Sequence, residues 1–158
     1  MKYVFIVLII ILAIYIYFLL SVVRYSLKCQ QYLMDIDKDI DKVFDKIKYF
    51  IKLLEDKKNI KILTNYLDSK ISTINQKNIF IDDVFNSLND IFASKEIDMT
   101  NFEISNLNNE LSNIHGDINN NIDQYNIYAT KYNKYISFKF ISFLTSILRC
   151  KKKLLFKR

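Results

Sequence analysis

Glycine and proline are almost missing from this chain of 158 residues, which has one glycine, Gly116, and no proline. Most β-turn types need glycine or proline, so a sandwich or barrel with many turns is excluded. Glycine-rich phosphate-binding loops are excluded as well, because their motifs contain at least two glycines. Hydrophobic residues make up 51% and charged residues 25%, which are ordinary globular values. The composition therefore predicts an ordered, all-α protein built from long helices.

The chain also has little of the chemistry that enzymes use. His115 is its only histidine, and no zinc-protease, Cys-x-x-Cys or nucleophile-elbow motif occurs. The aspartates from Asp35 to Asp41 resemble the start of a calcium loop, but Ile40 and Lys46 stand where that loop needs glycine and glutamate. We expect these aspartates to be solvated. We predict no catalytic residue, no cofactor and no metal site, and therefore no enzyme.

The first feature that is present is an uncharged run from Tyr3 to Val23. Its 21 residues would extend about 31 Å as a helix, close to the thickness of the hydrocarbon core of a bilayer. We therefore predict a transmembrane anchor over residues 1–23. A cleaved signal peptide is the alternative, but its apolar region is shorter and ends at small residues. Acylation at Cys29, as in a lipoprotein, is disfavoured because Lys28 precedes it.

The flanking charges give a weak preference for one orientation of this single-pass anchor. Lys2 precedes the run, and Arg24, Lys28 and Lys38 follow it, so the positive-inside rule leans towards a cytoplasmic body in the cell membrane. Cys29 and Cys150 are far apart in sequence, and a disulfide between them would need an oxidising compartment. We expect free thiols.

Beyond the anchor, apolar residues recur at steps of three and four, the spacing of helices that pack as in coiled coils. The four stretches with this spacing are Leu33 to Leu54, Ile60 to Ile74, Ile81 to Ile91 and Ile104 to Ile136. Polar breaks are expected at residues 57–59 and 75–78. Thr100 and Glu103 have capping-box spacing, so we expect Thr100 to cap the last helix.

These stretches predict the fold. The anchor helix should continue without a break to about Asp56 and enter an antiparallel four-helix bundle over residues 24–148. Because the helices alternate in direction, the end of the fourth helix should return to the membrane surface.

A basic tail follows over residues 149–158. It holds six cations and no acid, although the rest of the chain is almost neutral: Arg149, Lys151, Lys152, Lys153, Lys157 and Arg158. The uncharged run from Phe140 to Leu148 is too short to span a bilayer. Two interpretations stay open. The region lies at the membrane surface with its cations on anionic head groups, or it is the end of a core helix with a frayed tail. Nucleic acid is not an expected partner.

The C-terminal third resembles the LemA family of bacterial membrane-anchored helical proteins. Tyr125-Asn126 is followed seven residues later by Tyr132-Asn133, like the YN-x5-YN signature of that family, and Phe138 falls on the Phe of its Phe-Pro. Upstream apolar positions agree in spacing, namely Ile104, Leu107, Leu111 and Ile118. Nearer the membrane, Tyr25 and Ile36-Asp37 are similar to the start of the family's first soluble helix.

The chain departs from the family at several positions. Lys139 replaces the proline after Phe138, Ile122 stands where an arginine is usual, and His115 stands where a glutamate is usual. The convincing similarity covers about residues 101–140. The resemblance implies an anchored four-helix bundle with no agreed catalytic activity.

The sequence thus gives two hypotheses of function. The first is a non-catalytic scaffold or partner-binding protein at the membrane, whose partners are the lipid bilayer and other proteins. The alternative is a membrane-sensing or membrane-remodelling protein that acts through its basic, apolar tail. The Tyr and Asn of the two YN pairs are expected to hold the bundle together by hydrogen bonds to a neighbouring helix.

Overall fold

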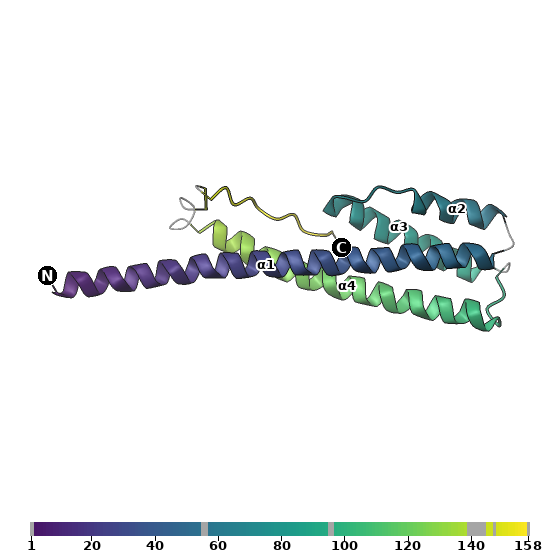
Figure 1. Ribbon diagram of the computed structural model, residues 1–158, viewed down its shortest axis with the longest axis horizontal. Helices are drawn as coiled ribbons and strands as arrows, with labels where there is room; N and C mark the ends of the chain where they lie inside the picture. The colour runs from purple at the N-terminus through teal and green to yellow at the C-terminus, as the bar shows by residue number, and fades with distance from the viewer. Residues whose placement is uncertain (1, 55–56, 95–96, 139–144, 147, 158) are drawn as a thin grey trace. The chain divides into compact units, whose positions relative to one another are not determined.

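The computed structural model describes residues 2–54, 57–94, 97–138, 145–146 and 148–157. Regular secondary structure in these ranges is entirely helical, which confirms the all-α prediction. Four helices follow one another along the chain (Figure 1): α1 (Lys2–Leu53), α2 (Lys57–Leu67), α3 (Ile74–Ala93) and α4 (Phe102–Ile136).

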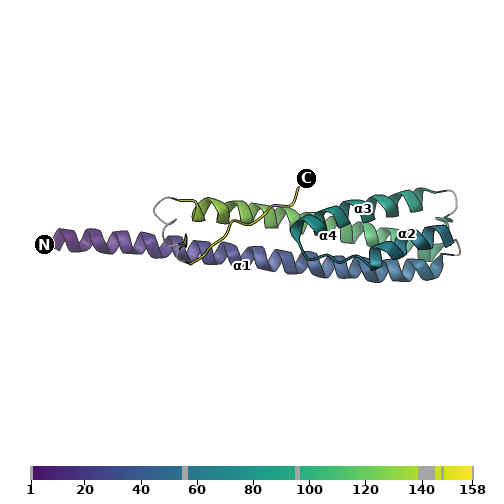
Figure 2. The ribbon, with the colours of Figure 1, turned by 90° about the horizontal axis from the view of Figure 1, so that it is seen from above.

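α1 is one unbroken helix of 52 residues, as expected from the lack of glycine and proline (Figure 2). It is the one helix in the described ranges that is long and apolar enough to cross a bilayer. Its apolar residues near the N-terminus are open to the surroundings, and Leu12 is 61% exposed. A core helix of a soluble protein would bury such residues. The helix ends at Leu53, and its expected end at Asp56 lies outside the described residues.

The chain divides into two compact units, and we describe each by itself. Unit 1 consists of Met1–Leu33 and Asp123–Leu155, and unit 2 consists of Met34–Ile122 and Phe156–Arg158. Unit 1 therefore contains the first part of α1 and the last part of α4. We call residues 150–157 the C-terminal segment, which contains neither helix nor strand.

The predicted apolar stripes form the core of unit 2. Four aromatic contacts join described residues of different helices there, and among them Phe50 of α1 stacks on Phe92 of α3 with ring centroids 4.8 Å apart. The stripe residues that are buried in unit 2 are Ile36, Ile40, Val43, Ile47, Phe50, Leu63, Ile81, Val84, Phe85, Leu88, Ile91, Ile104, Leu107, Leu111, Ile114, Ile118 and Ile122. The heptad spacing thus identified the buried faces of α1, α3 and α4 correctly. In the second stretch, Leu63 is the one buried side chain among those described, and Leu67, Ile71 and Ile74 are half-buried.

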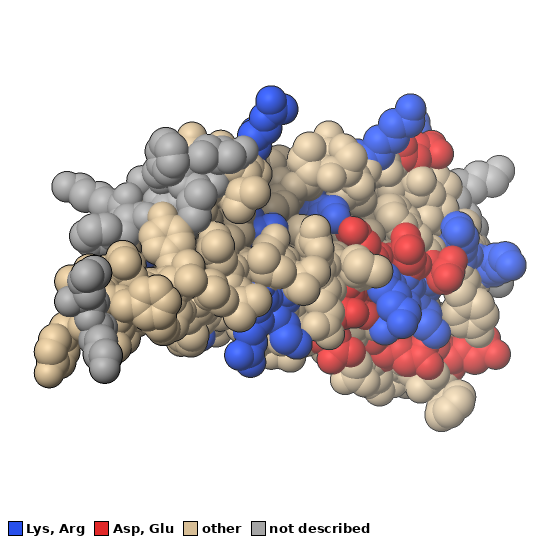
Figure 3. Space-filling view, turned by 60° about the vertical axis from the view of Figure 1, so that its left-hand side comes forward, with Lys and Arg blue, Asp and Glu red and all other residues tan. Residues whose placement is uncertain are grey.

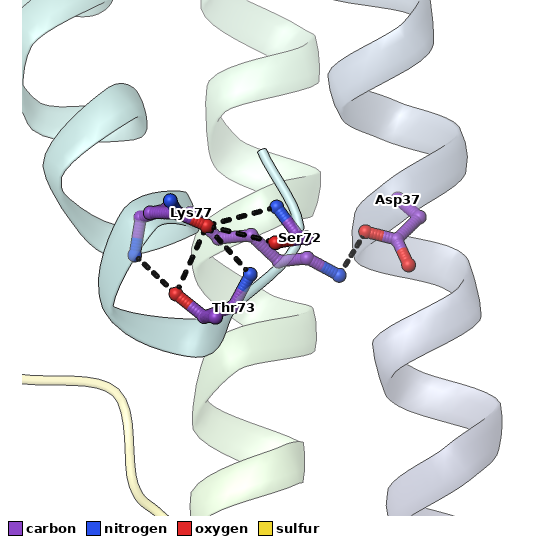
Figure 4. Close-up of polar contacts among 5 residues, drawn as sticks. Asp37, Ser72, Thr73 and Lys77 are labelled. Carbon is purple, nitrogen blue, oxygen red and sulfur yellow. Dashed lines mark hydrogen bonds and ion pairs between the residues drawn. The ribbon is translucent and has the colours of Figure 1, made fainter. Parts of the chain in front are cut away.

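The boundary between α2 and α3 differs from the prediction. α2 ends at Leu67, and residues 75–78, expected as a break, lie in the first turns of α3. Thr73 explains the difference because it caps α3. Its side chain accepts a hydrogen bond from the Gln76 N–H at 3.2 Å, and the Gln76 Oε1 accepts from the Thr73 N–H at 3.0 Å (Figure 4). This reciprocal pair is a capping box, which outweighs the polar character of the residues that follow.

Two other helix starts also differ from the sequence expectation. Lys57, expected in a polar break, is the first residue of α2. The cap of α4 is Asn101 rather than Thr100, because the Asn101 Oδ1 accepts from the Glu103 N–H at 2.9 Å and from the Ile104 N–H at 3.3 Å. Thr100 is engaged elsewhere, and its hydroxyl donates to Asp98 at 2.6 Å. Asparagine is among the best capping residues, so the one-residue shift has a simple cause.

Candidate functional site

The last part of α4 presents the two YN pairs to the C-terminal segment. Tyr125 and Tyr132 are seven residues apart, so they share one face of the helix, and both are buried. α4 ends at Ile136, whereas the helical bundle was expected to extend to residue 148, and the Thr145 hydroxyl donates to the Ile136 carbonyl at 3.3 Å. The C-terminal end of the helix is thereby partly satisfied.

A turn then directs the C-terminal segment back along α4. The Arg149 N–H donates to the Ser146 carbonyl at 3.0 Å, and the Cys150 N–H donates to the Thr145 carbonyl at 2.8 Å. Arg149 has a φ of 51°, in the left-handed region that residues other than glycine adopt infrequently. The local hydrogen bonds hold this conformation and reverse the chain.

Two side chains of α4 hold the main chain of the segment, and we call them the clamp. Asn133 forms a two-way pair with Lys153: its Nδ2 donates to the Lys153 carbonyl and its Oδ1 accepts from the Lys153 N–H, each at 2.8 Å. The Tyr125 hydroxyl donates to the Leu154 carbonyl at 2.9 Å. Asn133 therefore satisfies both main-chain polar groups of Lys153, the N–H and the C=O, as a neighbouring β-strand would.

Side-chain contacts reinforce the clamp. The Lys153 ammonium lies 5.1 Å from the centre of the Tyr132 ring, which is a cation–π geometry. Cys150 packs against a small apolar cluster formed by Val22 of α1 and by Tyr132 and Ile136 of α4. The segment is therefore fixed both at its first residue and at its middle.

Burial disfavours ionisation of the tyrosine and cysteine side chains around the clamp. It raises the pKa of Tyr125 to about 12, with a smaller contribution from Cys29, and it raises the pKa of Tyr132 to about 12, with a smaller contribution from Cys150. Burial also raises the pKa of Cys29, and the positive charge of Lys153 offsets part of this effect. A thiol that stays protonated is a poor nucleophile. The site is therefore suited to holding a chain by hydrogen bonds rather than to covalent chemistry.

An aromatic row lines the contact between α1 and α4 in unit 1. Phe138 stacks on Phe18 at 5.5 Å between ring centroids, and Phe18 lies 5.4 Å from Tyr135. Tyr25 follows on α1, at 5.3 Å from Tyr135 and 6.1 Å from Tyr128. Phe18 thus contacts Phe138 and Tyr135, whereas Tyr25, later in α1, contacts Tyr135 and the earlier Tyr128. The two helical parts therefore run in opposite directions in this unit.

The structure brings four of the residues singled out from the sequence into one site: Tyr125, Tyr132, Asn133 and Lys153. Their partner differs from the expected one, because Asn133 bonds to an extended segment and not to another helix. Asn126 is half-buried beside them. The sequence contained one signal for this arrangement, an asparagine placed beside a buried stripe, but nothing in it identified the partner.

The basic tail does not act as one group. Arg149, Lys151 and Lys152 are exposed, whereas Lys153 is half-buried on the clamp. Lys157 belongs to unit 2, where it lines a cavity of about 160 Å³ together with Asp82. Arg158 lies outside the described residues. Contact of this tail with a membrane stays a prediction.

Unit 2 contains the other polar cluster. Lys77 of α3 is 7% exposed and pairs with Asp37 of α1 (Figure 4). A cavity of about 400 Å³ lies beside the pair, with Asp41 also in its lining. Opposite charges in one cavity neutralise each other, which does not favour strong capture of an ion. Figure 3 shows the same mixing of acidic and basic side chains over one part of the surface, and an uncharged stretch elsewhere.

Asp39 corrects the expectation that the aspartates near the start of the body are all solvated. It is 5% exposed, and it accepts hydrogen bonds from Lys42 at 2.7 Å and from the Asn121 Nδ2 at 3.0 Å. The two donors compensate the desolvated carboxylate. Asp39 therefore helps to hold α4 against α1 in unit 2.

His115 has a packing role in unit 2. Its ring stacks on Phe85 with centroids 4.0 Å apart, and burial lowers its pKa. Within the described ranges, no group of three or more His, Cys, Asp or Glu side chains is arranged to hold a metal ion. Comparison with models of protein families, with curated proteins and with solved structures finds no match for the chain.

Proposed function

We propose that this chain is a single-pass membrane protein whose helical body serves as a non-catalytic scaffold for other proteins. The observation that carries the proposal is the exposed apolar start of α1, which continues without a break into a well-packed body. Exposure of the sixteen apolar residues between Tyr3 and Val23 that the fold leaves uncovered would be very unfavourable in water, whereas a bilayer accommodates them. The remaining helices complete an antiparallel four-helix bundle, as in the LemA family that the YN pairs resemble.

Several contacts support a scaffolding role over catalysis. The residues of the YN motif hold the C-terminal segment, and the carboxylates of Asp37, Asp39 and Glu110 are engaged by lysine side chains. These groups stabilise the fold and are not poised towards a substrate. The surface of the body is then the part that partners contact.

The anchor is tested by fractionation. Membranes from cells that express the full chain are extracted with alkaline carbonate, and a variant with Leu12→Arg and Ile16→Arg in the apolar run is the matched control. We expect the native chain to stay in the pellet and the variant to be released. Release of the native chain would contradict the proposed anchor.

Orientation is tested by labelling Cys150 with a membrane-impermeant maleimide in a Cys29→Ala background. The side chain of Cys150 is partly exposed, whereas Cys29 is fully buried, so the signal reports on Cys150. We propose a cytoplasmic body, and labelling should then require permeabilised cells. Labelling of intact cells would place the body outside.

The membrane-remodelling alternative is favoured by one observation, the exposure of Arg149, Lys151 and Lys152 close to residues of the anchor. Proteoliposomes that contain the full chain or a chain without residues 149–158 distinguish the hypotheses. A scaffold leaves vesicle size and leakage the same in both samples. Remodelling that disappears with the tail would favour the alternative.

A further inference from the structure

Contacts in unit 1 show which residues near the end of α4 lie beside the end of the apolar run on α1. The run ends at Val23, and Val22 packs against Tyr132 and Ile136 of α4. Two residues after the end of α4, Phe138 stacks on Phe18 with ring centroids 5.5 Å apart. Phe18 precedes Val23 by five residues, which is about 7 Å along a helix. If the run spans a bilayer, the chain just after α4 therefore reaches below the membrane surface.

The start of the C-terminal segment also lies beside the end of the apolar run. Thr145 bonds to the Ile136 carbonyl, and Cys150 packs on the cluster that contains Val22. The connection between α4 and the C-terminal segment thus begins and ends beside the last turns of the apolar run. Contacts of Phe138 and Thr145 fix one end, and contacts of Cys150 fix the other.

The exposed side chains at these two ends have the chemistry of a membrane interface. Phe138 is 47% exposed and Leu148 is 62% exposed, and neither would gain from contact with water. Arg149, Lys151 and Lys152 follow and are exposed. Apolar residues beside cations are typical of segments that lie between acyl chains and anionic head groups.

We propose that the two described ends of this connection form a second membrane contact, in which Phe138 and Leu148 enter the interface of the same leaflet and Arg149, Lys151 and Lys152 bind anionic lipid head groups. Lys153 has no part in it, because the clamp and the Tyr132 ring hold it against the protein. The inference rests on the proposed anchor and goes beyond it. It divides the basic tail into a part that faces lipid and a part that faces protein.

The test of insertion uses the lack of tryptophan in the chain, which makes any introduced tryptophan the only one. The full chain is reconstituted in vesicles of phosphatidylcholine and phosphatidylglycerol that contain lipids brominated near the glycerol end of the acyl chain. Phe138→Trp and Leu148→Trp are the reporters, Leu12→Trp reports on the anchor, and Phe102→Trp, which is 83% exposed in unit 2, is the control. We expect these shallow bromines to quench at 138 and 148, lipids brominated near the methyl end of the acyl chain to quench at 12, and neither to quench at 102.

The outcomes separate this inference from the proposed function. Quenching at 12 but not at 138 or 148 would overturn the second contact and leave the anchor intact. Absence of quenching at 12 would refute the anchor, and the second contact with it. Two reporters are used so that a local disturbance at Phe138 does not decide the result.

The choice of lipid is tested by removing two charges in matched pairs. Each lysine near an anionic surface contributes a factor of about five, so Lys151→Gln with Lys152→Gln should weaken insertion of the Leu148→Trp reporter by about thirtyfold. Lys153→Gln with Lys157→Gln removes the same charge and should change it by less than about threefold. Equal effects of the two pairs, or no dependence on phosphatidylglycerol, would overturn the assignment of the lipid-facing cations.

Discussion

Removal of the Asn133 side chain is the most direct perturbation of the clamp. Asn133→Ala deletes two hydrogen bonds of 2.8 Å to Lys153. Each is worth about 0.5–1.5 kcal/mol net, so docking of the C-terminal segment should weaken by about 2 kcal/mol. That corresponds to about a thirtyfold increase in the population of the undocked segment.

Hydrogen exchange of the Lys153 amide measures this population, because the amide exchanges when the segment opens. The full chain is held in nanodiscs, and Asn120→Ala serves as the control, since Asn120 is an exposed asparagine of the same helix. We expect exchange at Lys153 to rise by at least about thirtyfold in Asn133→Ala, because the substitution also removes the acceptor of this amide, and to stay unchanged in the control. An acceleration below about twofold, or an equal effect of both substitutions, would refute the reasoning.

Three further outcomes are expected. Gly116→Ala should stabilise the chain by about 1 kcal/mol in thermal unfolding, because a Cβ at this helical position meets no atom within 4 Å. Asp37→Ala should destabilise unit 2 more than Lys77→Met does. Asp37→Ala leaves the buried Lys77 ammonium without its partner, whereas methionine at position 77 fills the site without a charge. Urea unfolding of the two variants measures the difference. Burial raises the pKa of Tyr125 from 10.0 to about 12, so its stabilising effect is complete below pH 10 and is lost as the pH rises towards 12. The free energy of unfolding of Tyr125→Phe should therefore fall less between pH 10 and 12 than that of the native chain.

The helices were predictable to the extent that one local pattern decides them. The apolar stripe of α4 gave its buried residues, because heptad spacing fixes the face of a long helix, but it did not give the end of the helix at Ile136. Helix starts were less predictable, since several capping residues compete within a few positions. Thr73 and Asn101 are the caps that form, and the Thr-x-x-Gln spacing at Thr73 is a signal that the sequence did contain.

The clamp could be predicted only in part. Heptad spacing and the resemblance pointed to Tyr125 and Asn133, but their partner lies about twenty to thirty residues further along an irregular segment. No periodicity indicates where such a segment will dock. Asp39 shows the same limit, because its burial depends on Asn121, a residue from a different helix. Long-range pairs of polar groups are therefore what local patterns leave open.

Because the clamp bonds to main-chain atoms, substitutions and insertions in the C-terminal segment should have different effects on docking. A substitution at Lys151, Lys152 or Leu154 alters no group that Asn133 or Tyr125 bonds, so docking tolerates many side chains there. An inserted or deleted residue between the turn at Arg149 and Lys153 would instead put the wrong peptide group opposite Asn133. The number of residues between Arg149 and Lys153 is thus constrained more strongly than the identity of their side chains.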